Sequence, residues 1–266
     1  MKTKNLFVAI AVSIVTVLGF TVCTPGGHES SNTNLSSPAL VEYSSTGRMT
    51  LGTAFEVFIP DNASAANLLD LYPGSSIFMW FDYNTEYQTD KDYPVASNIY
   101  YEPVTVDYIQ EDDPEMIADY NFPFSSVQWL LDPSSPRSTS FSLNYKGRFF
   151  VLIAAKLGTN QALHYYPYIK VDEPLDENGA RNIYLQAKLP GTSTGTQDVF
   201  SAYGLNMRSM LYYSGRDTTI TEAGVTYSLR YIKINLKYCK SIDNGTPVFQ
   251  SMETQPIPIY VLKDDL

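Results

Sequence analysis

The feature that most restricts the fold is a repeated alternation of apolar and polar residues in short stretches. Within residues 183–189 the apolar positions occupy one parity and the polar positions the other, and the stretches at 49–59, 163–171 and 232–238 follow the same rule. A period of two places alternate side chains on opposite faces of a strand, so each stretch predicts a half-buried β-strand. Turn residues such as Asn178-Gly179 separate the stretches, and no long helical period occurs. The sequence therefore predicts an all-β protein.

Composition divides this predicted all-β chain into five parts. Pro- and Ser-rich residues 132–139 indicate a boundary between two folded regions, because such residues favour turns and loops. Residues 28–40 are rich in Ser and Asn and have too few apolar side chains to offset chain entropy. The expected parts are a signal peptide (1–22), a flexible tether (23–42), a small N-terminal β-barrel domain (43–110), a linker (111–139) and a C-terminal antiparallel β-sandwich domain (140–266).

The first residues have the organisation of a bacterial export signal. Lys2 and Lys4 precede an apolar run that ends at Cys23. The run is long enough to cross a bilayer, so an uncleaved signal anchor is the alternative. Cys23, followed by Thr24-Pro25-Gly26-Gly27, resembles the lipobox of bacterial lipoproteins. That resemblance implies cleavage before Cys23 and lipidation of its sulfur, and hence an outer-membrane lipoprotein of the cell envelope.

The chain is acidic, with a net charge of −10. Loss of residues 1–22 would remove Lys2 and Lys4 and leave 16 basic against 28 acidic residues, a net charge of −12. A negative surface repels phosphate backbones, so the composition disfavours a nucleic-acid partner. The expected partners are the membrane, through the lipid anchor, and a glycan or an envelope protein.

Few residues are available for catalysis. The chain has two histidines, of which His28 lies in the predicted tether and only His164 in a predicted domain. Cys239 lies in a strand pattern and is expected to be a buried thiol. Nucleophile-elbow, P-loop and dinucleotide motifs do not occur. We therefore expect no catalytic residue, no metal and no cofactor.

The remaining enzymatic alternative is a carboxylate pair that hydrolyses glycosides. Acidic residues are numerous, but those that the pattern places lie mostly in turns: Asp172, Glu173, Asp176 and Glu177. Such an enzyme would require two facing carboxylates in one cleft, about 5–10 Å apart.

Aromatic side chains suggest a binding role. The chain has 21 tyrosines, and strand propensity accounts for many of them. His164, Tyr166 and Tyr168 recur with period two on the polar face of one predicted strand. An exposed row of this kind presents flat rings with polar atoms, which suits stacking against a sugar or a protein partner.

Besides Cys23, three stretches carry a family resemblance: SIFMWFDYNTEY, NIYYEPVTVDYI, and the region from FFVLIAAKLG to FSAYGLNM. Most of the mature chain thereby resembles the NigD-like lipoproteins of Gram-negative anaerobes. This resemblance implies a lipoprotein signal, a small OB-like N-terminal barrel and a C-terminal β-sandwich. It also implies a non-enzymatic envelope protein, and it carries no functional residues over to this chain.

Arg48 in SSTGRMTLG lies just before the first strand predicted for the N-terminal domain. This arrangement resembles lipoprotein fimbrial subunits, in which a protease cuts at an arginine that precedes the first strand. On this alternative, the C-terminal strand 257–262 would complete the sheet of a neighbouring subunit by strand addition.

Overall fold

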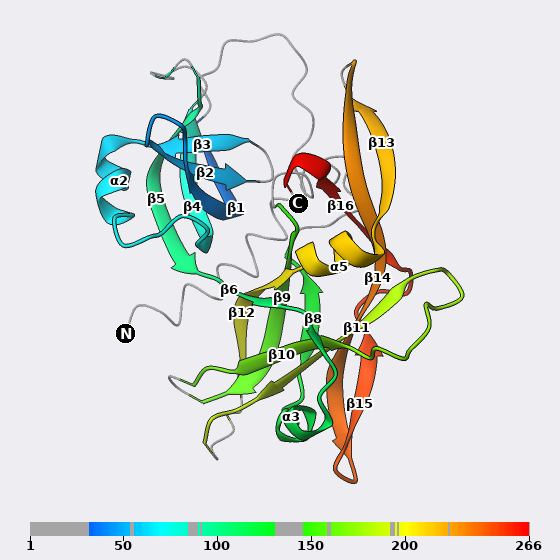
Figure 1. The fold of residues 1–266 in the computed structure, drawn as a ribbon. Helices are drawn as coiled ribbons and strands as arrows, with labels where there is room; N and C mark the ends of the chain where they lie inside the picture. Colours follow the sequence, from blue (N-terminus) through cyan, green and yellow to red (C-terminus); the bar gives the residue numbers. More distant parts are fainter. Residues whose placement is uncertain are drawn as a thin grey trace. The chain divides into compact units, whose positions relative to one another are not determined.

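The computed structural model describes residues 32–53, 56–84, 90, 92–130, 146–158, 161–191, 195, 197–222 and 224–265. The predicted signal peptide, Cys23 and His28 lie outside these residues. The chain divides into two compact units, residues 1–104 and 105–266. The described part is mostly β, with three sheets and a few short helices (Figure 1).

In unit 1, the described strands close into a ring in the order β1-β2-β3-β5-β4. All neighbouring pairs are antiparallel except β3 and β5, which are parallel. The strands are β1 (Asn32–Tyr43), β2 (Met49–Thr53), β3 (Val57–Pro60), β4 (Ser76–Asn84) and β5 (Val95–Pro103).

The inward side chains of the ring form one hydrophobic core. Alternation along β4 sends Ile77, Met79 and Phe81 inward, and Phe81 meets Phe58 of β3 edge to face at 4.9 Å. Helix α2 (Asn62–Asn67) begins after Asp61, whose carboxylate accepts a hydrogen bond from the backbone N–H of Ser64. Ser64 itself is buried, and its hydroxyl accepts a hydrogen bond from the backbone N–H of Ile99.

Two expectations for this region are wrong. Residues 32–42 of the predicted tether belong to strand β1, which pairs with both β2 and β4. They are held because Leu35, Ala39 and Val41 face the core of the ring. Residues 49–59 were expected to form one strand, but β2 and β3 are two strands of an antiparallel pair in which Leu51 faces Phe58.

Unit 2 contains two sheets. The first has the order β13-β14-β11-β10-β7, with β15 and β16 also paired to β14, and the second has the order β6-β12-β9-β8. The strands of the first sheet are β7 (Gln110–Glu111), β10 (His164–Ile169), β11 (Arg181–Lys188), β13 (Arg216–Glu222), β14 (Val225–Asp243), β15 (Thr246–Ser251) and β16 (Ile257–Leu262). Those of the second are β6 (Thr105–Tyr108), β8 (Ser126–Trp129), β9 (Arg148–Leu157) and β12 (Gln197–Asn206).

The two sheets of unit 2 share one hydrophobic core. Ile183 and Leu185 of β11 belong to the same buried cluster as Val151 of β9 and Leu205 of β12. The alternate side chains of β11, such as that of Gln186, point to the outer face of its sheet. There the buried side chain of Gln186 accepts a hydrogen bond from the Tyr168 hydroxyl at 2.7 Å and donates one to the Tyr120 carbonyl at 2.6 Å.

The pairing in unit 2 differs from the expected antiparallel sandwich. The pairs β10·β7, β11·β14 and β12·β6 are parallel, so both sheets are mixed.

The expected linker 111–139 is also wrong in part, because helix α3 (Pro114–Asp119) and strand β8 lie within it. The Asp113 carboxylate caps α3 by accepting hydrogen bonds from the N–H groups of Glu115 and Met116. Asp113 therefore stabilises the first turn of α3.

The remaining helices are α5 (Arg208–Ser214) and the short 3-10 helix η1 (Lys263–Asp265). None of the helices within the described ranges has the length and apolar composition that crossing a membrane requires.

Candidate functional site: a cationic pocket at a gap in a sheet

Strand β14 is the longest described strand, and its neighbours change along its length (Figure 1). Residues 225–231 pair with β13, and residues 234–238 pair with β11. Strand β16 pairs with residues 229–234 and so overlaps both ranges. Because a strand has only two edges, β13 and β11 must occupy the same edge, opposite β16. On that edge, Ile232 and Lys233 have no partner strand among the described residues.

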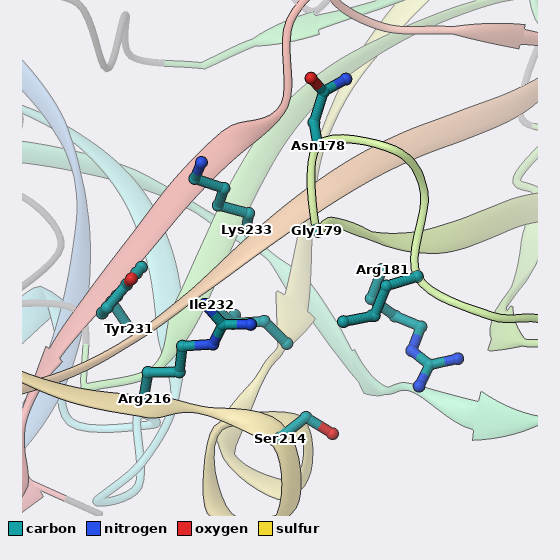
Figure 2. A pocket seen from close by; sticks show the side chains of 9 residues that line it. Asn178, Gly179, Arg181, Ser214, Arg216, Tyr231, Ile232 and Lys233 are labelled. Carbon is teal, nitrogen blue, oxygen red and sulfur yellow. The ribbon is translucent and has the colours of Figure 1, made fainter.

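A pocket of about 280 Å³ lies at this gap. One side comes from the end of α5 and the start of β13, and the other from the loop before β11, with β14 between them (Figure 2). Its lining residues are Leu175, Asn178, Gly179, Arg181, Ser214, Arg216, Tyr231, Ile232 and Lys233. Three of the nine are cationic and none is acidic.

Gly215 places Ser214 and Arg216 beside the pocket. A Cβ atom at this position would lie 2.4 Å from the Leu211 carbonyl oxygen and 2.7 Å from Cγ of Arg230. Only glycine allows the chain to pass from α5 to β13 this closely. The backbone N–H of Gly215 also donates a hydrogen bond to the Leu211 carbonyl at 3.0 Å. This connection fixes the first residue of β13, Arg216, opposite Tyr231 of β14.

A hydrogen-bonded turn forms the other side of the pocket. The Asp176 carboxylate accepts hydrogen bonds from the N–H groups of Asn178 and Ala180, and from the Asn235 side chain on β14. Gly179 has a φ of 72°, a left-handed conformation that favours glycine. The sequence predicted this turn from Asp176 to Gly179. The turn positions Asn178 and Gly179, and it leads directly into Arg181.

Glu173 anchors the same loop. One oxygen of its carboxylate accepts hydrogen bonds from the Asn182 amide and the Tyr184 hydroxyl, both at 2.9 Å. Burial, followed by the hydrogen bond to Glu173, raises the pKa of Tyr184. The Arg181 guanidinium donates a hydrogen bond to the Glu173 carbonyl, which fixes this cation at the pocket. Glu173 and Asp176, two of the carboxylates considered for glycoside hydrolysis, thus hold the loop in place.

The pocket carries an unbalanced positive charge in an acidic protein. Arg216 and Lys233 are exposed, and neither has a carboxylate within ion-pair distance among the described residues. Asp217, the neighbour of Arg216, pairs instead with Lys263 at 3.0 Å and Arg230 at 3.9 Å. The ion pair with Lys263 lowers the pKa of Asp217. Unpaired cations around a small pocket attract anions, and guanidinium groups match the planar geometry of carboxylates.

The predicted stacking residues lie elsewhere, on the outer face of the same sheet. His164, Tyr166 and Tyr168 face Lys188, Gln186 and Tyr184 across the β10·β11 pair. Tyr168 is only 2% exposed, because Tyr166 and Tyr184 pack against its ring at 5.6 and 5.3 Å. The expectation of an exposed row is therefore wrong for Tyr168. Contact of His164 and Tyr166 with a ligand stays a prediction.

Arg48 and the C-terminal strand bear on the fimbrial alternative. Arg48 precedes β2, and its guanidinium pairs with Asp90 at 2.7 Å. Residues 257–262 form β16, which pairs with six residues of β14 in its own chain. A strand already paired in its own sheet is not free to complete another subunit.

Cys239 is the described cysteine, and its thiol is fully buried, as the strand pattern predicted. Burial raises the pKa of this thiol to about 11, which keeps it protonated and unreactive near neutral pH. Within the described ranges, His, Cys, Asp and Glu side chains form no cluster of three or more that could hold a metal ion.

Comparison with known proteins establishes a shared fold. No protein-family model matches the chain, and none of the curated proteins matches it. An uncharacterised protein from Parabacteroides merdae is 15% identical, with a TM-score of 0.54 over 85% of this chain and 96% of that chain. A lipoprotein candidate from Bacteroides fragilis is 10% identical, with a TM-score of 0.51 over 86% of this chain and 98% of that chain.

A NigD-like immunity protein from Bacteroides caccae also matches, with 14% identity and a TM-score of 0.49 over 83% of this chain and 93% of that chain. The sequence resemblance predicted structural similarity to lipoproteins of Gram-negative anaerobes, and the Bacteroides fragilis lipoprotein candidate shows such similarity. At these identities the likeness concerns the fold alone.

The sequence did not single out any residue of the pocket as functional. Arg181 and Arg216 each lie at the first residue of a strand, close behind a glycine, and Lys233 occupies a polar position in an alternating stretch. Each position is ordinary by itself. Only the change of neighbours along β14 brings the three cations to one place.

Proposed function

We propose that this chain is a non-enzymatic, lipid-anchored protein of the cell envelope that binds an anionic ligand in the cationic pocket of unit 2. The observation that carries the proposal is the concentration of Arg181, Arg216 and Lys233 at a gap in the sheet of an otherwise acidic chain. An acidic surface with one cationic pocket repels anions in general and binds them at one place. The ligand would belong to a glycan or to an envelope protein.

The proposed location rests on the beginning of the sequence. Lys2, Lys4 and the apolar run to Cys23 form an export signal that resembles those of lipoproteins, and the Bacteroides fragilis lipoprotein candidate shares the fold. Diacylation of Cys23 would anchor the chain stably, because each buried methylene contributes about 0.8 kcal/mol. We place the anchor in the outer membrane.

Lipidation can be tested directly in cells. Cells that express the full chain should incorporate labelled palmitate into it, and the Cys23→Ala variant should lose the label. The Cys239→Ala variant is the matched control and should retain it, since that thiol is buried in the fold. Equal labelling of the wild type and Cys23→Ala would contradict the proposed anchor.

The proposal also includes the finer architecture that the NigD-like resemblance implies. The ring of unit 1 would be a small OB-like barrel, and the two sheets of unit 2 would be a β-sandwich with mixed pairing. Of the alternatives, the fimbrial one is less favoured, because β16 is already paired in its own sheet.

Anion binding can be tested by isothermal titration of the full chain in detergent with sulfate, phosphate and galacturonate. At least one of these anions should bind, and the affinity should fall as sodium chloride is added, because salt screens exposed charges. The double variant Arg216→Gln/Lys233→Gln should weaken binding at least tenfold. Both side chains are exposed and lack a carboxylate partner in the described structure, so the fold should be unaffected.

The matched control is Lys170→Gln/Lys188→Gln, which removes the same charge from unit 2 outside the pocket. These two ammonium groups lie over the rings of Tyr184 and Tyr120. The control should bind anions within about twofold of the wild type. If both double variants lose the same affinity, overall charge rather than the pocket governs binding, and the proposed site is wrong.

A further inference from the structure

The pocket offers three kinds of surface within one small volume. Arg181, Arg216 and Lys233 supply positive charge, and the Ser214 hydroxyl and the Asn178 amide supply neutral hydrogen-bonding groups. Ile232 and Leu175 supply apolar surface. A simple inorganic anion would use only the first kind. A ligand that uses all three must combine a negative charge, hydroxyl groups and an apolar face in one small body.

An aromatic ring also borders the pocket. Tyr231 is half-buried, and Tyr260 of the neighbouring strand β16 stacks against it with ring centroids 5.6 Å apart and planes at 25°. This stacking holds the Tyr231 ring in place at the pocket. Figure 2 shows Tyr231 beside Ile232 on β14, with Arg216 close to them and Arg181 on the other side of the view. Tyrosine rings present an apolar face and a hydroxyl together, which suits contact with sugar C–H groups and hydroxyls.

The volume limits the size of the ligand. Small-molecule sites typically measure about 300–1,000 Å³, and this pocket of about 280 Å³ is slightly smaller than that range. It suits one six-membered ring with a charged substituent rather than a nucleotide or a folded peptide segment. The gap faces solvent, since Arg216, Lys233 and Ser214 are exposed, so further units of a chain could continue outside.

We propose that the pocket binds a carboxylate-bearing sugar residue, such as a uronic acid unit of an acidic glycan. This inference rests on the proposed function and names its ligand class. The carboxylate would lie against the Arg216 guanidinium, because a planar guanidinium donates two parallel hydrogen bonds to a carboxylate. The ring would lie against Tyr231, and its hydroxyls would meet the Ser214 side chain.

The overall charge of the protein favours such a ligand over a densely charged polyanion. The chain carries a net charge of −10, which on average repels a nucleic acid or a polyphosphate. A glycan with neutral sugars around an occasional acid would meet little of this repulsion.

The test compares four probes on the full chain in detergent: trigalacturonate, its methyl ester, triglutamate and inorganic phosphate. Trigalacturonate should bind at least tenfold more tightly than each of the other three. The methyl ester keeps the rings and loses the charge, triglutamate keeps three carboxylates and loses the rings, and phosphate has neither ring nor hydroxyl-rich face.

Variants of Tyr231 separate the sugar from the charge. Tyr231→Leu should weaken trigalacturonate at least fivefold and leave any measurable phosphate affinity within about twofold, because only the sugar uses the ring. Tyr231→Phe keeps the ring and should bind trigalacturonate within about threefold of the wild type. If Tyr231→Leu fails to fold, the four-probe comparison on the wild type still decides the ligand class.

The outcomes distinguish this inference from the proposed function. If phosphate or triglutamate binds as tightly as trigalacturonate, and Arg216→Gln/Lys233→Gln weakens that binding, the sugar class is wrong and the anion pocket stands. If the methyl ester binds as tightly as the acid, the carboxylate is not recognised and the inference fails. If no anion, including those in the titration proposed above, depends on the pocket cations, both proposals fail.

Discussion

Replacement of Ile183 by alanine is expected to lower the free energy of unfolding of unit 2 by about 2–5 kcal/mol. Ile183 is fully buried in the core that the two sheets of unit 2 share. It lies on β11, which pairs with β10 on one side and β14 on the other. Neighbours held on both sides cannot collapse into the space left by the side chain, so a cavity remains. Urea unfolding followed by circular dichroism measures the loss.

Two controls define this effect. Ile183→Val removes one methyl group and should cost only about 0.5–1.5 kcal/mol. Val171→Ala removes apolar atoms from a side chain that is 53% exposed and should change stability by no more than about 0.5 kcal/mol. Equal losses for Ile183→Ala and Val171→Ala would mean that Ile183 does not lie in the core.

The second large effect is expected from Gln186→Ala. The Gln186 side chain is fully buried on the opposite face of β11, where it bonds both the Tyr168 hydroxyl and the Tyr120 carbonyl. Alanine would leave both of these groups without their partner. A buried polar group that loses its hydrogen bond costs about 1–3 kcal/mol, so for two such groups the expected loss of stability in urea unfolding is about 2–6 kcal/mol.

Tyr168→Phe is the matched control, because it removes only the hydroxyl at one end of this network. It should cost less than Gln186→Ala. Hydrogen exchange gives a local measurement, since the Tyr120 carbonyl follows directly after α3. Gln186→Ala should speed amide exchange in residues 114–120, and unchanged exchange there would show that Gln186 does not hold this segment.

Alternation predicts much of this fold because side chains on a strand have only two directions. Ile183, Leu185 and Ala187 were predicted to share one face of a strand, and all three are buried in the core. The same rule explains a failure. Residues 49–59 keep an alternating pattern through the reversal between β2 and β3, so the pattern reads as one strand although Leu51 and Phe58 face each other. An alternating pattern shows which side chains share a face of a strand, but it does not show where one strand ends and the chain reverses direction.

Pairing partners were the other part that the sequence could not show. Strand β1 lies in a Ser- and Asn-rich stretch whose composition is that of a tether, yet it holds nine pairs with β4. Its order comes from partners distant in the chain. The candidate pocket depends on the same kind of information, because the gap at Ile232 and Lys233 exists only through the registers of β11, β13 and β16 with β14. The alternation of residues within one stretch does not determine its pairing register with a strand far away in the sequence.

The continuity of β14 has a consequence for how this architecture could diversify. A deletion of one residue at 232 or 233 would reverse the facing of one half of the strand, and buried residues such as Ile234 would turn outward. The floor of the pocket is thus fixed in length by the core. The 170–180 loop, which forms one wall of the pocket, is a surface segment, and loops tolerate insertions and substitutions. Proteins of this fold could keep the same floor and vary this loop, and so bind different ligands at the same position in the fold.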